Sequence, residues 1–145
     1  MSLPPLDERA IMIGAVATDW RDAVRLAGRA LVAADVARPG YADEMVRMIE
    51  EHGPYVVIAP GLALAHARPG DDVLKDGLAV VTLATPVPFG HPYNDPVRVI
   101  LALAIRSPAG HLESVAAIAN VFNDTTAVQD LIAAHTAAEV LAIFR

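Results

Sequence analysis

Residues 53 to 69 read GPYVVIAPGLALAHARP, and they carry the clearest structural and chemical signals in this chain of 145 residues. A strand-like run from Tyr55 to Ile58 is followed by a Pro-Gly break at residues 60 and 61. Aromatic and β-branched residues favour strands, whereas a Pro-Gly pair favours a turn. A short apolar stretch then leads to one imidazole, His66, with Arg68 two residues further on. We therefore predict a strand that ends at this break, followed by a loop that presents His66.

The flanking sequence alternates between strand-like and helix-like segments. Short apolar runs predict further strands over residues 11–17, 78–83 and 97–105. The last two runs are apolar at nearly every position, which is typical of central strands covered on both faces. Apolar residues three and four apart predict one helix from about residue 19 and a second from residue 41 to the Gly-Pro pair at 53.

The C-terminal part of the chain is predicted to be helical. Pro108 suits the first turn of a helix, whose apolar stripe is predicted to consist of Leu112, Val115, Ala116 and Ala119. Asn123-Asp124 can cap a short helix that runs through Ala134, and Thr136 with Glu139 has the spacing of a capping box. Strands and helices thus alternate, so we predict an α/β fold, a single domain with a mixed β-sheet and helices on both faces.

Length and composition narrow the class of protein. Residues 1–9 are expected to be an irregular N-terminal segment, and residues 10–145 are long enough for one domain with its own core. No apolar run reaches the ~20 residues of a membrane span, and no secretory signal pattern is visible. The chain has no cysteine, and its net charge of -6 comes without a basic stripe for nucleic-acid phosphates. We expect a cytoplasmic protein that binds no nucleic acid and does not insert into a membrane.

His66 is the main candidate for chemistry. A neutral imidazole is a competent nucleophile toward phosphorus near neutral pH. The small alanines around His66 leave room for a partner, and Arg68 offers a fixed, planar positive charge to an anion. This combination suits a transient phosphohistidine. The alternative is a partly buried histidine with a purely structural role.

Two other segments contain candidate site residues. His111 follows Ser107 and Pro108 near the start of a predicted helix, where free N–H groups and the helix dipole can hold phosphate. The alternative for His111 is an exposed residue of the first turn. His91, Asn94 and Asp95 lie in a proline-rich loop before the strand at 97–105, and we predict that they line the rim of the site. Simple turn chemistry explains Asn94 and Asp95 equally well.

The sequence offers one arrangement for a metal ion. His66, His91 and His111 together could bind zinc with an open fourth position, as in a metal-dependent hydrolase. Their separations contain no short His-x-His or His-x₃-His pair, and neither a cysteine nor a pair of acids joins them. The chain also lacks a Gly-rich phosphate loop followed by Lys and Ser or Thr. We therefore expect neither a metal nor a nucleotide or other cofactor.

The motifs at residues 53–55, 59–61 and 66–69 resemble the active-site stretch of enzyme IIA components of sugar phosphotransferase systems, in their mannitol/fructose-type superfamily. Together with the Gly-His pair at 90–91 and Asn-Asp-Pro-Val at 94–97, they look most like the ascorbate branch. The resemblance covers roughly residues 10–145. It implies an enzyme IIA type-2 domain with the mannitol-type α/β fold.

In that family the histidine is the phosphoryl carrier, so the resemblance implies a phosphotransferase. Phospho-HPr would donate a phosphoryl group to Nε2 of His66, which would pass it to an enzyme IIB. Ascorbate or a related sugar would then be phosphorylated during uptake through the membrane subunit IIC. The superfamily pattern also implies that His111 supports the phosphorylated His66 across the site. The oligomeric state is left open, a homo-oligomer included.

Two positions depart from the family pattern. Ala65 stands where a proline usually precedes the carrier histidine, and Met48 stands where many mannitol-type members have an arginine. The ascorbate-like members also lack that arginine, so either Arg68 or Arg47 is left to balance the phosphate charge. Two rival functions remain. One is a regulatory phosphoprotein of the same fold, and the other is the three-histidine hydrolase.

Overall fold

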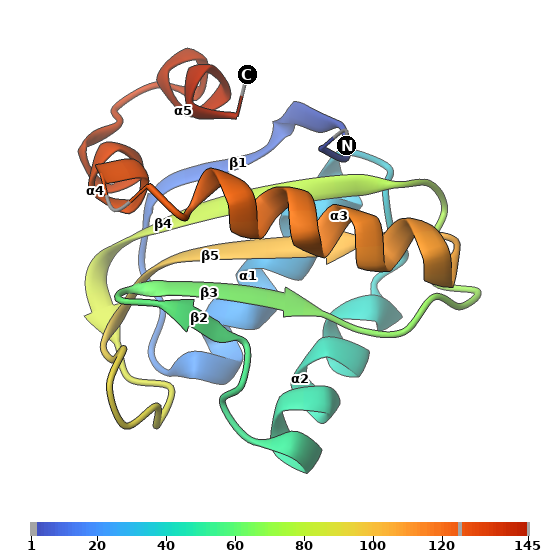
Figure 1. Cartoon of the computed structure of the whole chain (residues 1–145). Helices are drawn as coiled ribbons and strands as arrows, with labels where there is room; N and C mark the ends of the chain where they lie inside the picture. The colour runs from blue at the N-terminus through green and yellow to red at the C-terminus, as the bar shows by residue number, and fades with distance from the viewer. Residues whose placement is uncertain (1–2, 125, 145) are drawn as a thin grey trace.

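The computed structural model of the chain describes residues 3–124 and 126–144. In these residues, strands form one sheet in the order β1-β4-β5-β3-β2 (Figure 1). The β1–β4 and β3–β5 pairs are parallel, whereas β4–β5 and β2–β3 are antiparallel. The predicted mixed sheet is therefore confirmed. Its strands are β1 (Leu6–Ala15), β2 (Val57–Ala59), β3 (Leu62–His66), β4 (Gly77–Val87) and β5 (Val97–Ala104).

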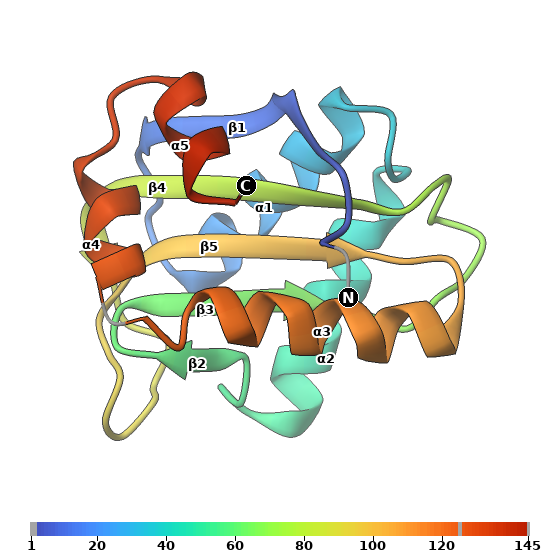
Figure 2. The same cartoon turned by 45° about the horizontal axis from the view of Figure 1, so that its top comes forward.

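Helices cover both faces of this sheet, as predicted. Helices α1 (Trp20–Ala33) and α2 (Gly40–His52) lie on one face. Helices α3 (Pro108–Val121), α4 (Thr126–Ala133) and α5 (Ala137–Ile143) lie on the other (Figure 2). No helix in the described ranges combines the length and the apolar character that crossing a bilayer requires.

Each face of the sheet has its own hydrophobic core. Leu31 of α1, Met45 of α2 and Ile100 of β5 belong to one core. Leu101 of β5 and Ile118 of α3 belong to the other. Because side chains alternate along a strand, the neighbours Ile100 and Leu101 point to opposite faces. Both are fully buried, and burying a side chain of this size stabilises the fold by ~1.5–3 kcal/mol. The prediction that β4 and β5 are central strands covered on both faces is confirmed.

Three helices begin where the sequence predicts and have side-chain caps. Asp19 accepts a hydrogen bond from the backbone of Asp22 before α1, and Ser107 accepts one from Gly110 at the start of α3. Before α5, Thr136 accepts a hydrogen bond from the backbone N–H of Glu139 at 3.2 Å. Its own hydroxyl donates to the Glu139 carboxylate at 3.3 Å. The predicted N-cap at Thr136 is confirmed, whereas Glu139 returns its bond to the Thr136 hydroxyl and not to the backbone N–H that a capping box uses.

The N-terminal prediction needs a correction. Residues 6–9 belong to β1, so the segment expected to be irregular is shorter than residues 1–9. Leu6 pairs with Leu78 of β4, and the fully buried Ala10 anchors the middle of the strand. The residues between them are polar, so the N-terminal part of β1 does not form an apolar run that would predict a strand. Residues 1 and 2 of the expected irregular segment lie outside the described residues.

The prediction that His66 lies in a loop is also wrong, because residues 62–66 form the strand β3. The Pro-Gly break is the turn of a hairpin between β2 and β3. Gly61 adopts a φ of 77°, a conformation that a residue without a Cβ adopts without strain. The chain therefore reverses direction at Gly61, and Val57 pairs with Ala63.

The buried face of α3 differs from the predicted stripe. Ser114, Ala117 and Ile118 are buried, whereas Leu112 is 73% exposed. Most residues of this helix are small or apolar on every side, so their spacing does not distinguish the inner face from the outer face.

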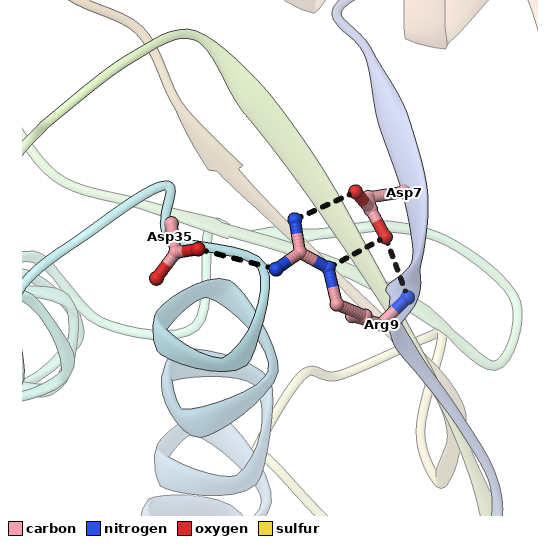
Figure 3. Close-up of polar contacts among 3 residues, drawn as sticks. All are labelled: Asp7, Arg9 and Asp35. Atoms are coloured by element: carbon pink, nitrogen blue, oxygen red, sulfur yellow. Dashed lines mark hydrogen bonds and ion pairs between the residues drawn. The ribbon is translucent and has the colours of Figure 1, made fainter.

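Charged residues tie β1, an edge strand, to the end of α1 (Figure 3). The Arg9 guanidinium donates to Asp7 at 3.0 Å and to Asp35, just after α1, at 3.1 Å. The hydrogen bonds from Arg9 lower the pKa of Asp7 to about 2. Exposed pairs of this kind contribute little to stability, but charges on an edge strand discourage pairing with another chain.

Candidate functional site

The sheet topology brings His66 and His111 together. His66 is the last residue of β3 and pairs with Leu103 on the parallel strand β5. β5 ends at Ala104, and α3 begins at Pro108 after a short turn, so the first turn of α3 lies beside the end of β3. The two imidazole centroids are 5.1 Å apart, with the ring planes inclined at 55°.

A pocket of about 210 Å³ opens at this place. It combines residues of α2, the end of β3, the segment after it and the first turn of α3. Three predicted site residues meet there, namely His66, Arg68 and His111. The complete lining is Met48, His66, Ala67, Arg68, Pro69, Pro108 and His111.

Hydrogen bonding fixes the tautomer of His66. Its Nδ1 lies 3.1 Å from the carbonyl oxygen of Leu64. Because a carbonyl oxygen can only accept, Nδ1 carries the proton and donates it to Leu64. The Nε2 atom is then left with a free lone pair. The ring of Tyr55 packs edge-on against the imidazole, at 5.9 Å between centroids and 85° between planes. The side chain of His66 is thus oriented from two directions and presents an unprotonated nitrogen.

Burial favours the neutral forms of both histidines. It is the main cause that lowers the pKa of His66 below 6.5, and nearby His111 lowers it further, while the carbonyl of Leu64 opposes this shift. Burial also lowers the pKa of His111. A charged imidazole loses hydration in such a place, so its proton is held less tightly. The site therefore maintains uncharged imidazoles near neutral pH.

His111 has polar capacity that the described residues do not use. Its Nδ1 atom is buried and has no hydrogen-bond partner among them. The backbone N–H of His111 donates to the carbonyl of Ser107, so the residue belongs to the first turn of α3. The positive end of the helix dipole lies at this turn. A buried polar atom without a partner is costly, so this Nδ1 is a feature that the described contacts leave unexplained.

The two candidate arginines differ in their surroundings. Arg68 lines the pocket with an exposed guanidinium. Arg47 is paired with Glu44 on the outer surface of α2 and is not among the residues that line the pocket. Met48, the neighbour of Arg47, faces the pocket instead. The arrangement favours Arg68 as the cation for an anion bound at His66.

The structure does not bring His91, Asn94 and Asp95 to this pocket, so the prediction that they form its rim is wrong. Their loop joins β4 to β5 at the end of the sheet opposite the tip of β3 (Figure 2). The Asn94 carbonyl accepts a hydrogen bond from Gly61, and His66 lies five residues further along β3, about 16 Å of extended chain.

Turn chemistry accounts for the side chains of His91 and Asp95, whereas the Asn94 amide donates to the carbonyl of Val57 on β2 at 3.4 Å. The Asp95 carboxylate accepts backbone hydrogen bonds from Phe89, Gly90 and His91. Nδ1 of His91 accepts hydrogen bonds from the backbone N–H groups of Tyr93, at 3.1 Å, and Asn94, at 3.0 Å. These bonds stabilise a rigid turn that enters β5.

The same positions overturn the three-histidine metal site. His91 is separated from His66 and His111 by the length of β3, so the three imidazoles cannot share one ion. In the described part of the chain, no three histidine, aspartate, glutamate or cysteine side chains gather in a way that could hold a metal. The hydrolase that depends on this site is therefore excluded as an interpretation.

Sequence reasoning missed the aromatic neighbours of the site. It placed Tyr55 in a strand, whereas its ring contacts His66 and is 43% exposed. Tyr41 lies on the buried face of α2, and its hydroxyl bonds to the backbone beside His66. The available signal was that a tyrosine on a buried face needs a partner for its hydroxyl.

Comparisons with known proteins identify the family of this chain. The pattern of the family described as "Phosphoenolpyruvate-dependent sugar phosphotransferase system, EIIA 2" matches residues 5–145. An ascorbate-specific PTS system EIIA component of Shigella boydii is 41% identical over 136 residues, which cover 93% of this chain and 88% of the relative.

Two solved structures are similar to this one. A PTS IIA protein of Streptococcus mutans has a TM-score of 0.85 at 34% identity, covering 94% of this chain and 88% of its own. The enzyme IIA for mannitol from Escherichia coli, solved with phosphorylated enzyme IIB, has a TM-score of 0.85 at 24% identity, with 97% and 96% covered. At this identity, the second likeness concerns the fold alone. The chain belongs to the EIIA 2 family of the phosphoenolpyruvate-dependent sugar phosphotransferase system, whose members are phosphotransferases with a phosphohistidine intermediate.

Proposed function

We propose that this protein carries a phosphoryl group on Nε2 of His66, accepting it from phospho-HPr and passing it to an enzyme IIB. The observation that carries the proposal is the hydrogen bond from Nδ1 of His66 to the Leu64 carbonyl, which leaves Nε2 unprotonated beside the pocket. A nucleophile must offer a lone pair to phosphorus, and Nε2 offers it without first losing a proton.

The proposed transfer is a direct displacement at phosphorus. The Nε2 lone pair forms the new N–P bond while the bond from phosphorus to the donor atom breaks, and its electron pair leaves with the donor. The imidazole becomes positively charged as its lone pair is shared. The carbonyl of Leu64 holds the Nδ1 proton and stabilises that charge. The second transfer, to enzyme IIB, is the same displacement with His66 as the leaving group.

Three features of the pocket can balance the negative charge of the phosphoryl group. Arg68 offers a guanidinium, which pairs with phosphate oxygens through two parallel hydrogen bonds. The first turn of α3 directs the positive end of its dipole at the pocket. A neutral His111 can donate one hydrogen bond as well. Catalysis of phosphoryl transfer consists mainly of such positioning and charge balance, so a small, open pocket is sufficient.

The names of relatives support the proposed substrate and partners. The relative at 41% identity is named as ascorbate-specific, and we propose that the pathway served by this chain takes up ascorbate or a related sugar acid. Membership of the EIIA family supports an enzyme IIB as the acceptor, which would in turn serve a membrane subunit IIC. Such an exchange takes place in the cytoplasm.

The first test is direct phosphorylation. With phosphoenolpyruvate, enzyme I and HPr, the protein should gain one phosphoryl group that is labile in acid and stable in base. Nuclear magnetic resonance of the ring nitrogens should place it on Nε2. A label on Nδ1, or a stable ester on serine or threonine, would contradict the proposed route.

The lowered pKa of His66 predicts how acceptance depends on pH. Because burial favours the neutral ring, the nucleophile should persist in solutions more acidic than the ordinary value of 6.5. The rate of acceptance at saturating phospho-HPr should fall only as the pH drops through the lowered pKa. Quench-flow experiments would measure the rate of acceptance at each pH, and nuclear magnetic resonance titration of the ring would measure the pKa of His66. A midpoint above 6.5 for His66 would contradict the prediction.

A further inference from the structure

The backbone leaves the sheet directly after His66. The β3–β5 pair is parallel, with His66 opposite Leu103. The N–H of Val99 donates to the carbonyl of Gly61 at 3.0 Å. Along β3, the backbone N–H and C=O groups of the odd-numbered residues therefore point toward β5. The next bond in the series would run from the N–H of Ala67 to the carbonyl of Leu103.

The hydroxyl of Tyr41 takes the place of that bond. Its oxygen accepts a hydrogen bond from the N–H of Ala67 at 3.1 Å and donates to the carbonyl of Leu103 at 2.6 Å. The carbonyl of Ala67, at 3.3 Å, is a more distant acceptor for the same proton. Tyr41 lies in the first turn of α2 and is only 2% exposed. One buried hydroxyl thus satisfies the backbone groups on both strands where the ladder ends.

We infer that Tyr41 is a positioning residue for phosphoryl transfer, whose hydroxyl separates the ends of β3 and β5 and directs the chain after His66 into the pocket. The inference rests on the proposed function of His66. The segment in question is short: Ala67 is buried, and Arg68 immediately follows it at the pocket. A change in the direction of the backbone at Ala67 therefore moves the guanidinium relative to the imidazole.

Two outcomes are open to the backbone without this hydroxyl. The N–H of Ala67 could remain buried without a partner, which is energetically costly. Otherwise β3 could extend by one bond, from Ala67 to Leu103, and draw Arg68 toward β5. Both outcomes disturb the geometry of the pocket. Burial raises the pKa of Tyr41 to about 12, so the hydroxyl keeps its proton and its role as a donor throughout the neutral range.

Tyr41 also borders the outer side of the same segment. It lines a second hollow together with Glu44, Arg68 and Pro69, adjacent to the pocket of His66. Arg68 and Pro69 line both hollows, so the segment that follows Ala67 borders each of them. The hydroxyl of Tyr41 holds the start of that segment at Ala67.

The test is Tyr41→Phe, which keeps the buried ring and removes the oxygen. We expect kcat for transfer from phospho-HPr to fall about tenfold to a hundredfold, the scale of a small misplacement at a reacting centre. The KM for phospho-HPr should stay unchanged because a buried side chain does not touch the partner. The Ala67 amide should exchange faster with solvent, and the ring signals of His66 should shift.

Thr82→Val provides the matched control. Thr82 is also buried, and its hydroxyl accepts a backbone hydrogen bond from Gly14 at 3.0 Å between β1 and β4. It pairs with Val99 at the far end of β5 from His66. This variant should lose comparable stability while keeping kcat and the protection of the Ala67 amide.

The outcomes separate this inference from the proposed function. A wild-type kcat in Tyr41→Phe, or an equal loss in Thr82→Val, would overturn the positioning role. If Tyr41→Phe does not fold, rapid exchange of the Ala67 amide in the unsubstituted protein would overturn it instead. Phosphorylation that persists without His66 would defeat the proposed function, but it would leave the exchange and ring-signal measurements valid.

Discussion

Replacing His66 with glutamine should abolish phosphoryl acceptance from phospho-HPr. The substitution keeps a polar side chain of similar length at the end of β3 but removes the nitrogen lone pair that attacks phosphorus. No other described histidine lines the pocket except His111, which is 5.1 Å away between ring centroids. We expect a loss on the order of 10⁶-fold, typical of removing a covalent nucleophile. Labelling by phosphoenolpyruvate, enzyme I and HPr measures it.

His135→Gln is the matched control for this substitution. His135 is exposed and precedes α5, on a different part of the chain from the pocket. The control should accept one phosphoryl group at the wild-type rate. Equal labelling of the wild type and the His66→Gln variant would end the carrier proposal. A folded His66→Gln protein, judged from its amide spectrum, is required for either result to count.

The overall fold could be predicted because its strongest signals are local. The runs at 78–83 and 97–105 are apolar at nearly every position, and the structure confirms them as the buried strands β4 and β5. The starts of α1, α3 and α5 depend on a side chain and a backbone N–H only a few residues apart. Patterns of this range are visible in one sequence.

The strand that carries His66 could not be predicted in the same way. β3 has five residues and is apolar without alternation, because both of its faces are buried. Its identity as a strand depends on partners that lie far away in the chain, on β5 at residues 99–103. Gly61 adopts a φ of 77°, which makes the Pro-Gly pair a hairpin turn. Hydrogen bonds to distant residues stabilise this conformation, and a single sequence does not show them.

Some residues of the site could be predicted from the sequence, and others could not. His66, Arg68 and His111 could be proposed from chemical type and from a family resemblance, and the structure brings them to one pocket. The loop around His91 was wrongly predicted to belong to the site because its polar residues stabilise a turn. The side chains of His91 and Asp95 bond to the backbone of their own loop, and a sequence does not distinguish such turn chemistry from a binding site. Only the strand register separates the two ends of the sheet.

Replacing His111 with alanine should slow phosphoryl transfer without preventing phosphorylation. The variant keeps His66 as the nucleophile but loses an imidazole whose buried Nδ1 has no partner among the described residues. It also loses a donor from the first turn of α3, where charge develops during transfer. Removing one such donor typically costs ~10²–10³ in rate. Quench-flow measurement of acceptance from phospho-HPr and of transfer to enzyme IIB would provide both rates.

The extent of labelling distinguishes the two histidines. His111→Ala should reach one phosphoryl group per chain after long incubation, whereas His66→Gln should reach none. His135→Ala serves as the control for removing an exposed imidazole next to a short helix. Since His111 is only partly buried and its Nδ1 has no hydrogen-bond partner among the described residues, its removal should cost about 1 kcal/mol of stability, and a slow rate would not reflect unfolding. Wild-type rates in both half-reactions would restrict the site to His66 and Arg68, and the role of α3 would be limited to its backbone.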